Sequence, residues 1–533
     1  MSTASLTTED DGQPPATAEE TAVAADKGDS PSVRQIVAFF AMVVGMFVAV
    51  LNVQIVGSSF KEIQAGLAAG RDEVSWVLTS ALIAEVVMIP LSGWLSRFLS
   101  TRWLFTIAAG GFSVFSLACA FSWNIESMVV FRSIQGFFGG AMMPTVFAST
   151  FLLFPPRMQN AAVAGASVVG TSAVAIGPTL GGWISEALSW HWLFLVSVPV
   201  GTFVMITVAI LVDFDRPNWR LGRRIDFLGI VLAAIFFGSV LIILEEGRRE
   251  DWFASHMIVT LTIVAFLAGL FLLWRELEVR EPVIDFRAFK NRNFVVGCFY
   301  IGVFGSGLYV PLYLLPLFLA RVRDMSTEQI GTTVVVLGLA MIVSAPSVGY
   351  MLRYIPRRYV AAMGFSMLAI GNYLQAGLTA ESGFYDLLLP QIIRGLSTQM
   401  CFLPMISLAL GKLPPEQVKN ASGLFNLTMR LGAAVAIAVA NNFLEVRTQH
   451  NYARIIESLP VGTQAGQQVM SKFHHMFELR IGDSPQASEA ALHLLIRLAE
   501  REAMVLAFND VTIAAAIWVA CSLVLLPLVR SVR

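Results

Sequence analysis

Long apolar runs alternate with short polar stretches along most of the chain. Each run is about 20 residues long, the length at which an α-helix crosses the hydrocarbon of a bilayer. The pattern therefore predicts an all-α polytopic membrane protein. We expect fourteen spans, at residues 35–56, 75–96, 103–121, 127–152, 161–184, 192–212, 226–244, 255–275, 294–319, 327–352, 358–379, 385–411, 420–444 and 506–529.

Basic residues in the connecting loops indicate how these spans are oriented. With both termini in the cytoplasm, the short inner loops hold seventeen Arg and Lys residues, and the short outer loops hold six. Cytoplasmic loops of membrane proteins are enriched in basic residues. The asymmetry favours fourteen spans, because one missed span would reverse the side of every later loop.

An internal repeat divides the spans into two halves. Four residues at the inner end of the second span recur 256 positions later: Pro90, Gly93, Arg97 and Arg102 match Pro346, Gly349, Arg353 and Arg358. Arg132 in the fourth span similarly matches Arg394, 262 positions later. A chance match among loop ends is the alternative. The repeat predicts two six-span halves around two inserted spans, with a substrate path between the halves near the midplane.

Composition narrows the class of protein, and it separates a polar tail from the membrane-spanning segments. The chain is 56% hydrophobic and 14% charged, with a formal net charge of −1, so no global field favours nucleic acid. We predict a disordered cytoplasmic tail at 1–33 with no signal peptide, a first half at 34–212, a linker with the inserted spans at 213–293, and a second half at 294–533. The four cysteines fall in apolar runs and suggest no disulfide framework or metal cluster.

A long outward-facing loop at 445–505 interrupts the second half. Its last part has the apolar spacing of a helix that continues into the final span. His474 and His475 are adjacent and so do not share a helix face, which favours a solvated surface over a metal site. We expect this loop to pack on itself or to meet a partner.

Two ionisable residues inside spans are candidates for proton coupling. Glu85 lies about ten residues into the second span, roughly 15 Å deep, where burial favours the neutral form of a carboxyl. It is a candidate proton carrier, and a permanently neutral acid bonded to a neighbouring helix is the alternative. Arg132 shares its span with Gly136, Gly139 and Gly140. It either faces a water-filled path or extends to the interface from about 9 Å below it.

Other polar residues within spans are candidates for the wall of a substrate cavity. Asn52 and Gln54 in the first span either line the cavity or bond across helices. Gln135 lies one turn from Arg132, and Arg394 has the equivalent place in the second half. Asn426 and Arg430 are four residues apart on one helix face. The candidate set is therefore Asn52, Gln54, Gln135, Arg394, Asn426 and Arg430.

Taken together, residues 35–530 resemble the fourteen-span drug:proton antiporter branch of the major facilitator superfamily, the EmrB/QacA type. The segments that carry the resemblance are LNVQIV, WVLTSALIAEVVMIPLSGWL, RSIQGFFGGAMMP, AIGPTLGGWI with HWLFLVSVPVG, DFLGIVL and ASGLFNLTMRLG. The resemblance links Arg132 to proton transfer. It places two gating motifs where the halves meet: Gly93, Arg97 and Arg102 at the inner end, and Gly177, Pro178, Gly181 and Gly182 in the fifth span.

The chain departs from the family pattern at three places. Asn52 stands where the family usually has Asp, which leaves proton carriage to Glu85. In the loop after the second span, Arg97 occupies the acidic position and Ser100 the second glycine, which puts the charge relay of that loop in doubt. Arg430 comes one residue later than the pattern expects.

The resemblance implies proton-driven efflux of hydrophobic or amphipathic drugs across the inner membrane, with no cofactor besides the proton motive force. It is strongest to EmrB-like proteins of Gram-negative bacteria, which implies a periplasmic adaptor (a membrane fusion protein) and an outer-membrane channel as partners. An exporter of one organic-anion metabolite on the same fold is the rival hypothesis, because Arg132, Arg394 and Arg430 would favour an anion. No nucleophile triad or phosphate loop supports an enzyme or a receptor.

Overall fold

The structure is a computed structural model that describes residues 31–70, 73–213, 215–219, 221, 226–279, 282–411, 413–458, 464–481 and 485–528. The predicted tail at 1–33 lies almost entirely outside these residues. The first half contains α2 (Val33–Ser58), α3 (Phe60–Gly66), α4 (Trp76–Leu99), α5 (Thr101–Ala120), α6 (Ile125–Gly140), α7 (Met142–Leu153), α8 (Pro156–Ala187), α9 (Trp192–Leu195) and α10 (Ser197–Leu211). Here α6 and α7 together form the predicted fourth span, and α9 and α10 form the sixth.

The second half contains α13 (Arg292–Arg321), α14 (Thr327–Tyr354), α15 (Arg357–Gln375), α16 (Phe384–Leu410), α17 (Pro415–Ser458) and α19 (Pro485–Ser522). Among the described residues, thirteen helical segments are long and apolar enough to cross a membrane. The remaining predicted span, 358–379, is α15, a less apolar helix that packs against α16 and α19. The predicted all-α, fourteen-span fold is confirmed.

The two halves pack against each other mainly through α8 with α14 and α4 with α17. Small residues allow these helices to approach closely. A Cβ on Gly331 of α14 would lie 2.9 Å from Thr179 Cα on α8, and one on Gly423 of α17 would lie 2.9 Å from the Ile89 carbonyl of α4. Most buried apolar side chains of both halves join one large cluster across this interface.

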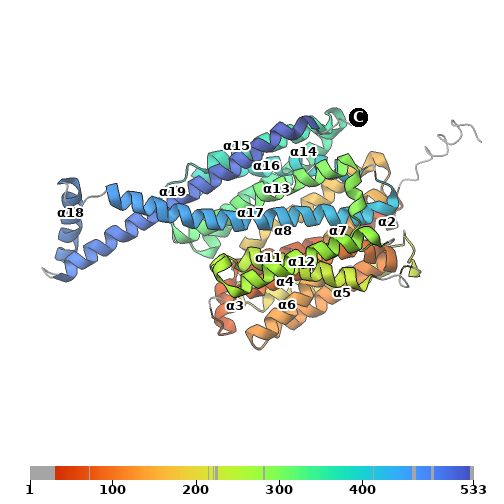
Figure 1. The fold of residues 1–533 in the computed structure, drawn as a ribbon, viewed down its shortest axis with the longest axis horizontal. Coiled ribbons are helices and arrows are strands. Elements are labelled where there is room, and N and C mark those ends of the chain that lie inside the picture. The colour runs from red at the N-terminus through yellow and green to blue at the C-terminus, as the bar shows by residue number, and fades with distance from the viewer. Residues whose placement is uncertain are drawn as a thin grey trace, which may run out of the picture.

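The inserted helices α11 (Phe227–Glu246) and α12 (His256–Glu278) pack against each other, and α11 also contacts α4 and α17 (Figure 1). At their base, the Asp226 carboxylate accepts from the Gly229 N–H at 3.0 Å and pairs with Arg275 at 3.1 Å. The two inserted helices therefore adjoin both halves through α11, which contacts α4 of the first half and α17 of the second.

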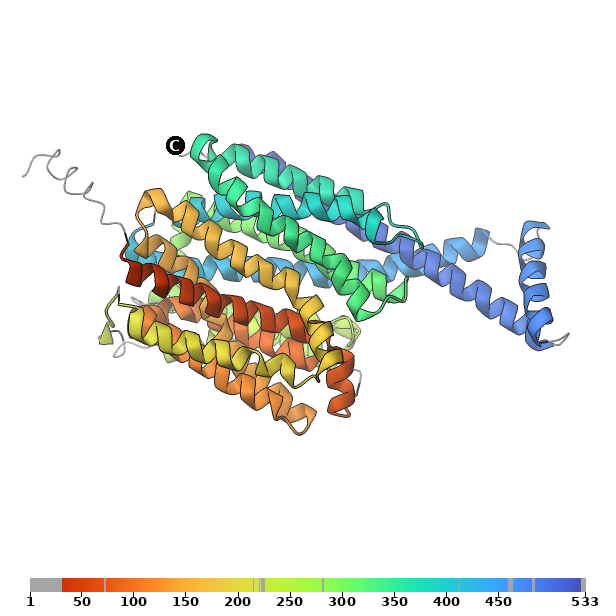
Figure 2. The ribbon, with the colours of Figure 1, turned by 180° about the vertical axis from the view of Figure 1, so that it is seen from behind.

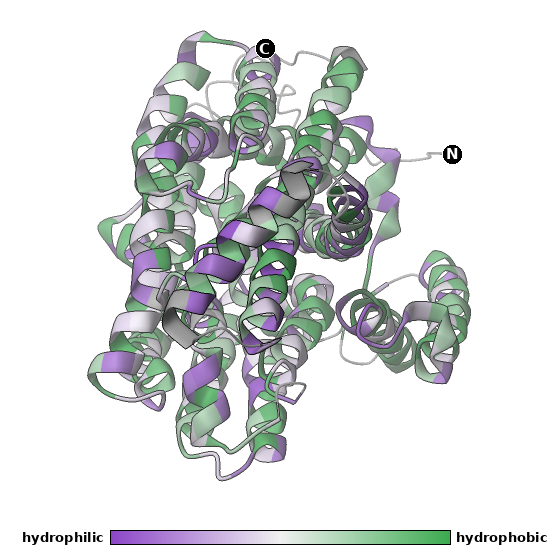
Figure 3. Cartoon of the chain, turned by 90° about the vertical axis from the view of Figure 1, so that its left-hand side faces the viewer, coloured by the Kyte–Doolittle hydropathy of each residue, from purple (hydrophilic) through white to green (hydrophobic). Residues whose placement is uncertain are grey.

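Beyond the bundle, α17 and α19 continue together as a helical arm that carries α18 (Gln464–Ile481) (Figures 1 and 2). Arg447 of α17 pairs with Asp510 of α19 at 2.7 Å where the arm leaves the bundle. In Figure 3 the α18 ribbon carries more hydrophilic colour than the bundle helices behind it. The predicted outward loop is therefore mostly helical in its described part, and its final segment continues into the last span as expected.

The first described helix begins, and the last one ends, at the same end of the bundle, opposite the arm (Figure 1). Ser32 caps the start of α2 with a capping box, accepting from the Gln35 N–H while its own N–H donates to the Gln35 side chain. This placement agrees with an even number of spans and with an arm on the far side of the membrane from both termini.

Candidate functional site

Glu85 and Arg430 form an ion pair that joins the two halves near the middle of the bundle. Arg430 Nη2 of α17 donates to Glu85 Oε1 of α4 at 2.7 Å. The Glu85 side chain is 13% exposed and that of Arg430 is 15% exposed. A half-buried charge with one partner depends strongly on that partner, because the lost hydration is replaced by a single interaction. Any movement of α17 relative to α4 therefore acts directly on Glu85.

Arg132 of α6 lies in the core of the first half and is 1% exposed. Its Nη1 donates to Asn52 Oδ1 and to Gln135 Oε1, both at 2.6 Å, and its Nε donates to the Val77 carbonyl at 3.1 Å. Arg132 Nη2 has no hydrogen-bond partner among the described residues. The Phe194 ring lies 5.6 Å from the guanidinium carbon. Neutral groups thus bind two of the three guanidinium nitrogens, and the two N–H donors of Nη2 are unpaired among the described residues.

The groups around Arg132 are themselves held by neighbouring helices. Gln135 Nε2 donates to the Ser116 hydroxyl of α5. Asn52 Nδ2 donates to the Ser197 hydroxyl of α10 at 3.3 Å. Asn52, where the family usually has an acid, therefore acts as a neutral acceptor for Arg132. The network fixes the guanidinium in the first half without a counter-charge in direct contact.

Two cavities lie on either side of the ion pair. The larger, about 60 Å³, lies between the halves and includes Arg430 in its wall. The smaller, about 20 Å³, is inside the first half and is lined by both Glu85 and Arg132. Met46, Val50 and Met143 line both of them. At roughly 10–15 Å³ per water, each holds only a few waters, so neither of these two cavities has room for a drug-sized molecule.

The six predicted cavity residues lie in different surroundings. Asn52 and Gln135 line the smaller cavity, and Arg430 lines the larger one. Gln54 and Asn426 line neither of these two cavities. The Gln54 Cβ lies 2.4 Å from the position that a Cβ on Gly177 would take, so Gln54 lies at the contact between α2 and α8. Asn426 is fully buried and donates to the Ser422 carbonyl of its own helix at 2.8 Å.

Arg394 lies inside the second half and is 0% exposed. None of its three guanidinium nitrogens has a hydrogen-bond partner among the described residues. Its Cγ lies 2.6 Å from the position that a Cβ on Gly371 of α15 would take, so the side chain runs along that helix. The residue that the repeat matches to Arg132 therefore lines neither cavity and faces α15 instead.

The Gly-Pro-x-x-Gly-Gly run of α8 lies between two neighbouring helices, α2 of the same half and α14 of the other half. Gly177, Gly181 and Gly182 are buried, and Pro178 is half-buried within the helix. Gly177 packs on α2, and the adjacent Thr179 packs on α14 of the other half. A proline removes one helix hydrogen bond, so this segment bends more easily than the rest of α8.

The inner gating motif also meets the other half. A Cβ on Gly93 would lie 2.7 Å from Asn420 Cα of α17, so α4 and α17 touch through their backbones at this position. Ser100, at the position of the family's second glycine, has φ +79°, a conformation that favours glycine. Arg97 and Arg102 are both half-buried, and Arg102 lies 5.5 Å from the Trp103 ring centroid. The loop keeps the glycine-like backbone although its residue is serine.

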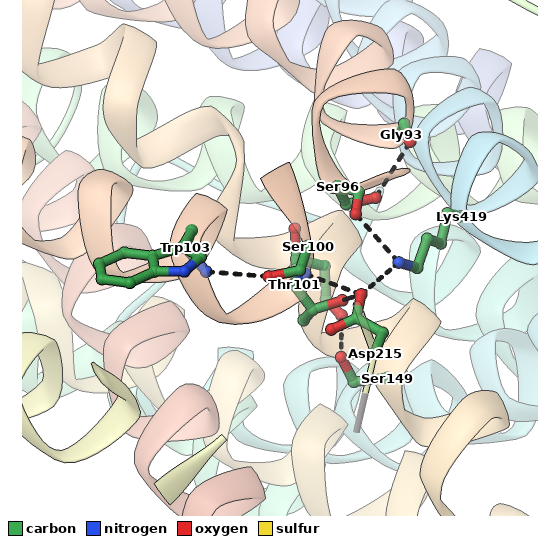
Figure 4. Close-up of polar contacts among 9 residues, drawn as sticks. Gly93, Ser96, Ser100, Thr101, Trp103, Ser149, Asp215 and Lys419 are labelled. Atoms are coloured by element: carbon green, nitrogen blue, oxygen red, sulfur yellow. Dashed lines mark hydrogen bonds and ion pairs between the residues drawn. The ribbon is translucent and has the colours of Figure 1, made fainter. Parts of the chain in front are cut away.

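Asp215, which follows α10, brings an acidic charge to this motif (Figure 4). Asp215 Oδ2 accepts from the Thr101 N–H and hydroxyl, each at 2.8 Å, and pairs with Lys419 Nζ of α17 at 2.5 Å. Lys419 also donates to the Ser96 carbonyl at 3.0 Å. The carboxylate therefore lies at the start of α5, where a helix favours negative charge, and links the first half to the second.

Neither Lys419 nor Asp215 was singled out from the sequence. Two acids, Asp213 and Asp215, at the start of the basic stretch after the sixth span were the available signal. Nothing in the sequence indicated the partners of Asp215, because Thr101 and Lys419 lie 114 and 204 positions away. The pairing of Glu85 with Arg430 was likewise missed, although both residues had been singled out separately.

The arrangement favours proton and solute movement over bond chemistry. Among the described residues, no group of three or more His, Cys, Asp and Glu side chains is placed to hold a metal ion. Acid and base lie instead between two cavities and between two halves that can move relative to each other. Such a carboxylate can exchange a proton for a cationic partner when the halves separate.

Comparison with known proteins agrees with this geometry. A Major Facilitator Superfamily model matches residues 42–437. The chain is 35% identical over 476 residues to the colistin resistance protein EmrB of Acinetobacter baumannii, covering 89% of this chain and 92% of that one. It is 31% identical to the multidrug export protein EmrB of Escherichia coli K12, over 79% of this chain and 82% of that one.

It is also 30% identical to the fatty acid resistance protein FarB of Neisseria gonorrhoeae, over 78% of this chain and 82% of that one. Among solved structures, the xylose transporter XylE of E. coli matches with a TM-score of 0.55 and 12% identity, over 91% of this chain and 97% of that one, which indicates a shared fold. Family model, relatives and fold agree, and the chain belongs to the major facilitator superfamily as an EmrB-like transporter.

Proposed function

We propose that this protein exports hydrophobic or amphipathic compounds in exchange for protons by alternating access. The Glu85–Arg430 ion pair is the observation that carries the proposal, since it joins the proton-binding candidate to the moving interface. The functions for which the two EmrB relatives are named, colistin resistance and multidrug export, support the same conclusion.

In the proposed cycle, Glu85 takes a proton from the outer side when the halves open outward and the ion pair breaks. Opening inward then releases the proton to the cytoplasm. Arg132, in the wall of the same small cavity, is a second cationic neighbour of the carboxylate once the proton has left. One charge crossing the field gains about 2.3 kcal/mol per 100 mV, and a pH gradient adds to this.

Export of an organic anion is a second candidate. Arg430 is the one charged group among the described residues that line the larger cavity. The FarB relative is a fatty acid resistance protein, which supports an anionic substrate on the same scaffold. Both candidates use the same fold and proton source.

We also propose that the protein lies in an inner membrane with both termini cytoplasmic, and that a periplasmic adaptor and an outer-membrane channel complete the export path. The helical arm formed by α17, α18 and α19 extends beyond the bundle on the side opposite the termini, where it is accessible to an adaptor. The resemblance to EmrB-like proteins is the support for these partners.

Proton movement in proteoliposomes tests the proposed antiport. Purified protein is reconstituted, a pH gradient is imposed, and a lipophilic cation or an organic anion is added. We expect at least one compound to collapse the gradient with wild-type protein and with Glu445→Gln, which removes an exposed ion pair with Arg248. Neither compound should act with Glu85→Gln. If neither compound collapses the gradient with folded wild-type protein, proton antiport of these compounds is wrong. The hypothesis that the protein exports one specific metabolite is then favoured.

A further inference from the structure

The base of the inserted helices contains two buried carboxylates that the proposed antiport does not use. Asp226 precedes α11 and is 3% exposed, and Glu276, near the end of α12, is 1% exposed. From this base α11 runs toward Arg248, which pairs with Glu445 of α17 where the arm leaves the bundle. The two carboxylates therefore lie at the end of the bundle opposite the arm, on the proposed cytoplasmic side.

The two carboxylates face each other across a glycine. A Cβ on Gly229 of α11 would lie 2.8 Å from Asp226 Oδ2 and 2.9 Å from Glu276 Oε1, so both oxygens border the same small space. Glu276 Oε2 accepts from the Ile284 N–H at 3.2 Å. Glu276 Oε1 is buried and has no hydrogen-bond partner among the described residues. An unpaired carboxylate oxygen is thus directed toward a second carboxylate.

The charges at this space do not balance when both acids are ionised. Arg275 Nε donates to both oxygens of Asp226, at 3.1 Å each, and so compensates one negative charge. No described cation forms an ion pair with Glu276. A buried charge without a partner is costly, and a second carboxylate beside it adds repulsion.

The other titratable groups nearby do not supply the missing positive charge. Asp285, in the segment that follows α12, is an acid that also acts on the charge of Glu276. In the same segment Arg287 is exposed and donates to the Val279 carbonyl at 3.3 Å, and Lys290 is exposed. The remaining described acids of α11 and α12 are Glu245 and Glu246, at the far end of α11, and the exposed Glu278.

A single proton suits this space better than a metal ion does. Among the described residues, no group of three or more His, Cys, Asp and Glu side chains could hold a metal. Hard cations such as Ca²⁺ take about six or more oxygen ligands, which two carboxylates do not provide. Two carboxylates that share one site hold one proton between them, because both cannot ionise without repulsion.

From this geometry we propose that Asp226 and Glu276 form a second protonation site, in which a proton on Glu276 Oε1 is shared with Asp226 Oδ2. The shared proton joins the base of α11 to the base of α12. When it leaves to cytoplasmic water, two like charges face each other and the base loosens. Since α11 packs on α4 and α17, this joint connects cytoplasmic pH to the helices that carry Glu85 and Arg430. The site is separate from Glu85 and does not depend on the proposed antiport.

Infrared spectroscopy detects the shared proton directly, because a protonated carboxyl has a C=O band that a carboxylate lacks. The reference protein is full-length Glu85→Gln in lipid nanodiscs, which removes the other candidate proton carrier. The spectrum is taken at about pH 7, where ordinary Asp and Glu side chains are ionised. We expect a carboxylic acid band that is lost on adding Glu276→Gln. Adding Glu278→Gln, which changes a nearby exposed acid, should leave the band unchanged.

The second measurement is the separation of the two helix bases. Spin labels are placed at Leu228→Cys and Leu277→Cys, both exposed positions, after the exposed Cys521 is replaced by alanine. We expect the distance distribution between the labels to broaden as the pH is raised from mildly acidic to mildly alkaline. Glu276→Gln carries no charge and can still donate a hydrogen bond to Asp226, so it should keep the narrow distribution at both pH values.

An infrared band that persists in Glu276→Gln would overturn the proposal, as would equal loss of the band in Glu278→Gln. Label distances that do not respond to pH would reject the joint. The infrared measurement is repeated in sodium, potassium and choline chloride. A band that disappears in the sodium or potassium salt alone would show that a metal ion occupies the space instead of a proton. Proton flux with wild-type protein is measured separately, so each proposal can fail without the other.

Discussion

The two halves of this transporter each bury an arginine at matching positions of the repeat, and they treat it differently. Arg132 has three hydrogen bonds to neutral acceptors and lines a small cavity with Glu85. Arg394 is more deeply buried, has no partner among the described residues and lines neither described cavity. The first half therefore places its cation in the wall of a cavity beside an acid, while the second half encloses it.

The same contrast holds at the inner gating motif. Gly93 touches the backbone of α17, whereas a Cβ on its repeat partner Gly349 would meet nothing closer than Ala164 Cβ at 3.8 Å. The repeat has kept the glycine in both halves, but close helix contact depends on it in the first half alone. Matching positions of the two halves therefore differ in the contacts that they make.

The largest expected effect comes from Glu85. Glu85→Gln should abolish proton-coupled transport, because the amide carries no proton between the two sides. Expression and folding should be retained, since Gln can still accept from Arg430. Transport driven by a pH gradient in proteoliposomes is the measurement, and an unchanged rate would contradict the role of Glu85.

A matched pair of arginine substitutions tests the contrast between the halves. Arg132→Met should strongly reduce transport and cost about 1–3 kcal/mol of stability, because Asn52 and Gln135 lose their donor. Arg394→Met should leave stability unchanged or raise it, since it removes a buried charge without a described partner. The measurement is the thermal unfolding temperature of both variants in nanodiscs, compared with that of wild-type protein. A larger loss for Arg394→Met would show that the second half depends on its arginine too.

Alanine at the two repeat glycines gives a smaller effect. Gly93→Ala places a methyl group against the α17 backbone, and such overpacking costs about 1–3 kcal/mol. We expect transport to fall severalfold, because the inner contact of the halves must open. Gly349→Ala has room and serves as the control, with transport near that of wild-type protein. Similar losses in both variants would remove the proposed asymmetry.

The smallest effect is expected at the inner ion pair. Asp215→Asn weakens a contact whose side chains are 12% and 16% exposed, which is worth about 1 kcal/mol at such a site. The halves should then separate more readily at the inner end. Cysteine labelling of an inner cavity position should be faster in Asp215→Asn than in Asp213→Asn, which changes an exposed acid nearby. Equal labelling rates would show that the pair does not hold the inner end closed.

Local sequence was sufficient for the architecture of this protein. Apolar runs of bilayer length predicted the spans, and the repeat predicted two halves with two inserted helices. These features follow from the chain's partition between water and lipid, which depends on neighbouring residues alone. Sequence also singled out Glu85, Arg132 and Arg430, because ionisable residues within a span are costly to bury.

The tertiary structure decided which of these residues meet. Glu85 and Arg430 lie 345 positions apart, and their pairing depends on how α4 packs against α17. The placement of Arg394 against α15, the role of Asp215 at the inner motif and the helical arm at 445–505 have the same origin. The repeat predicted equal halves, but each helix meets different neighbours in each half, and burial and hydrogen bonding are properties of those contacts.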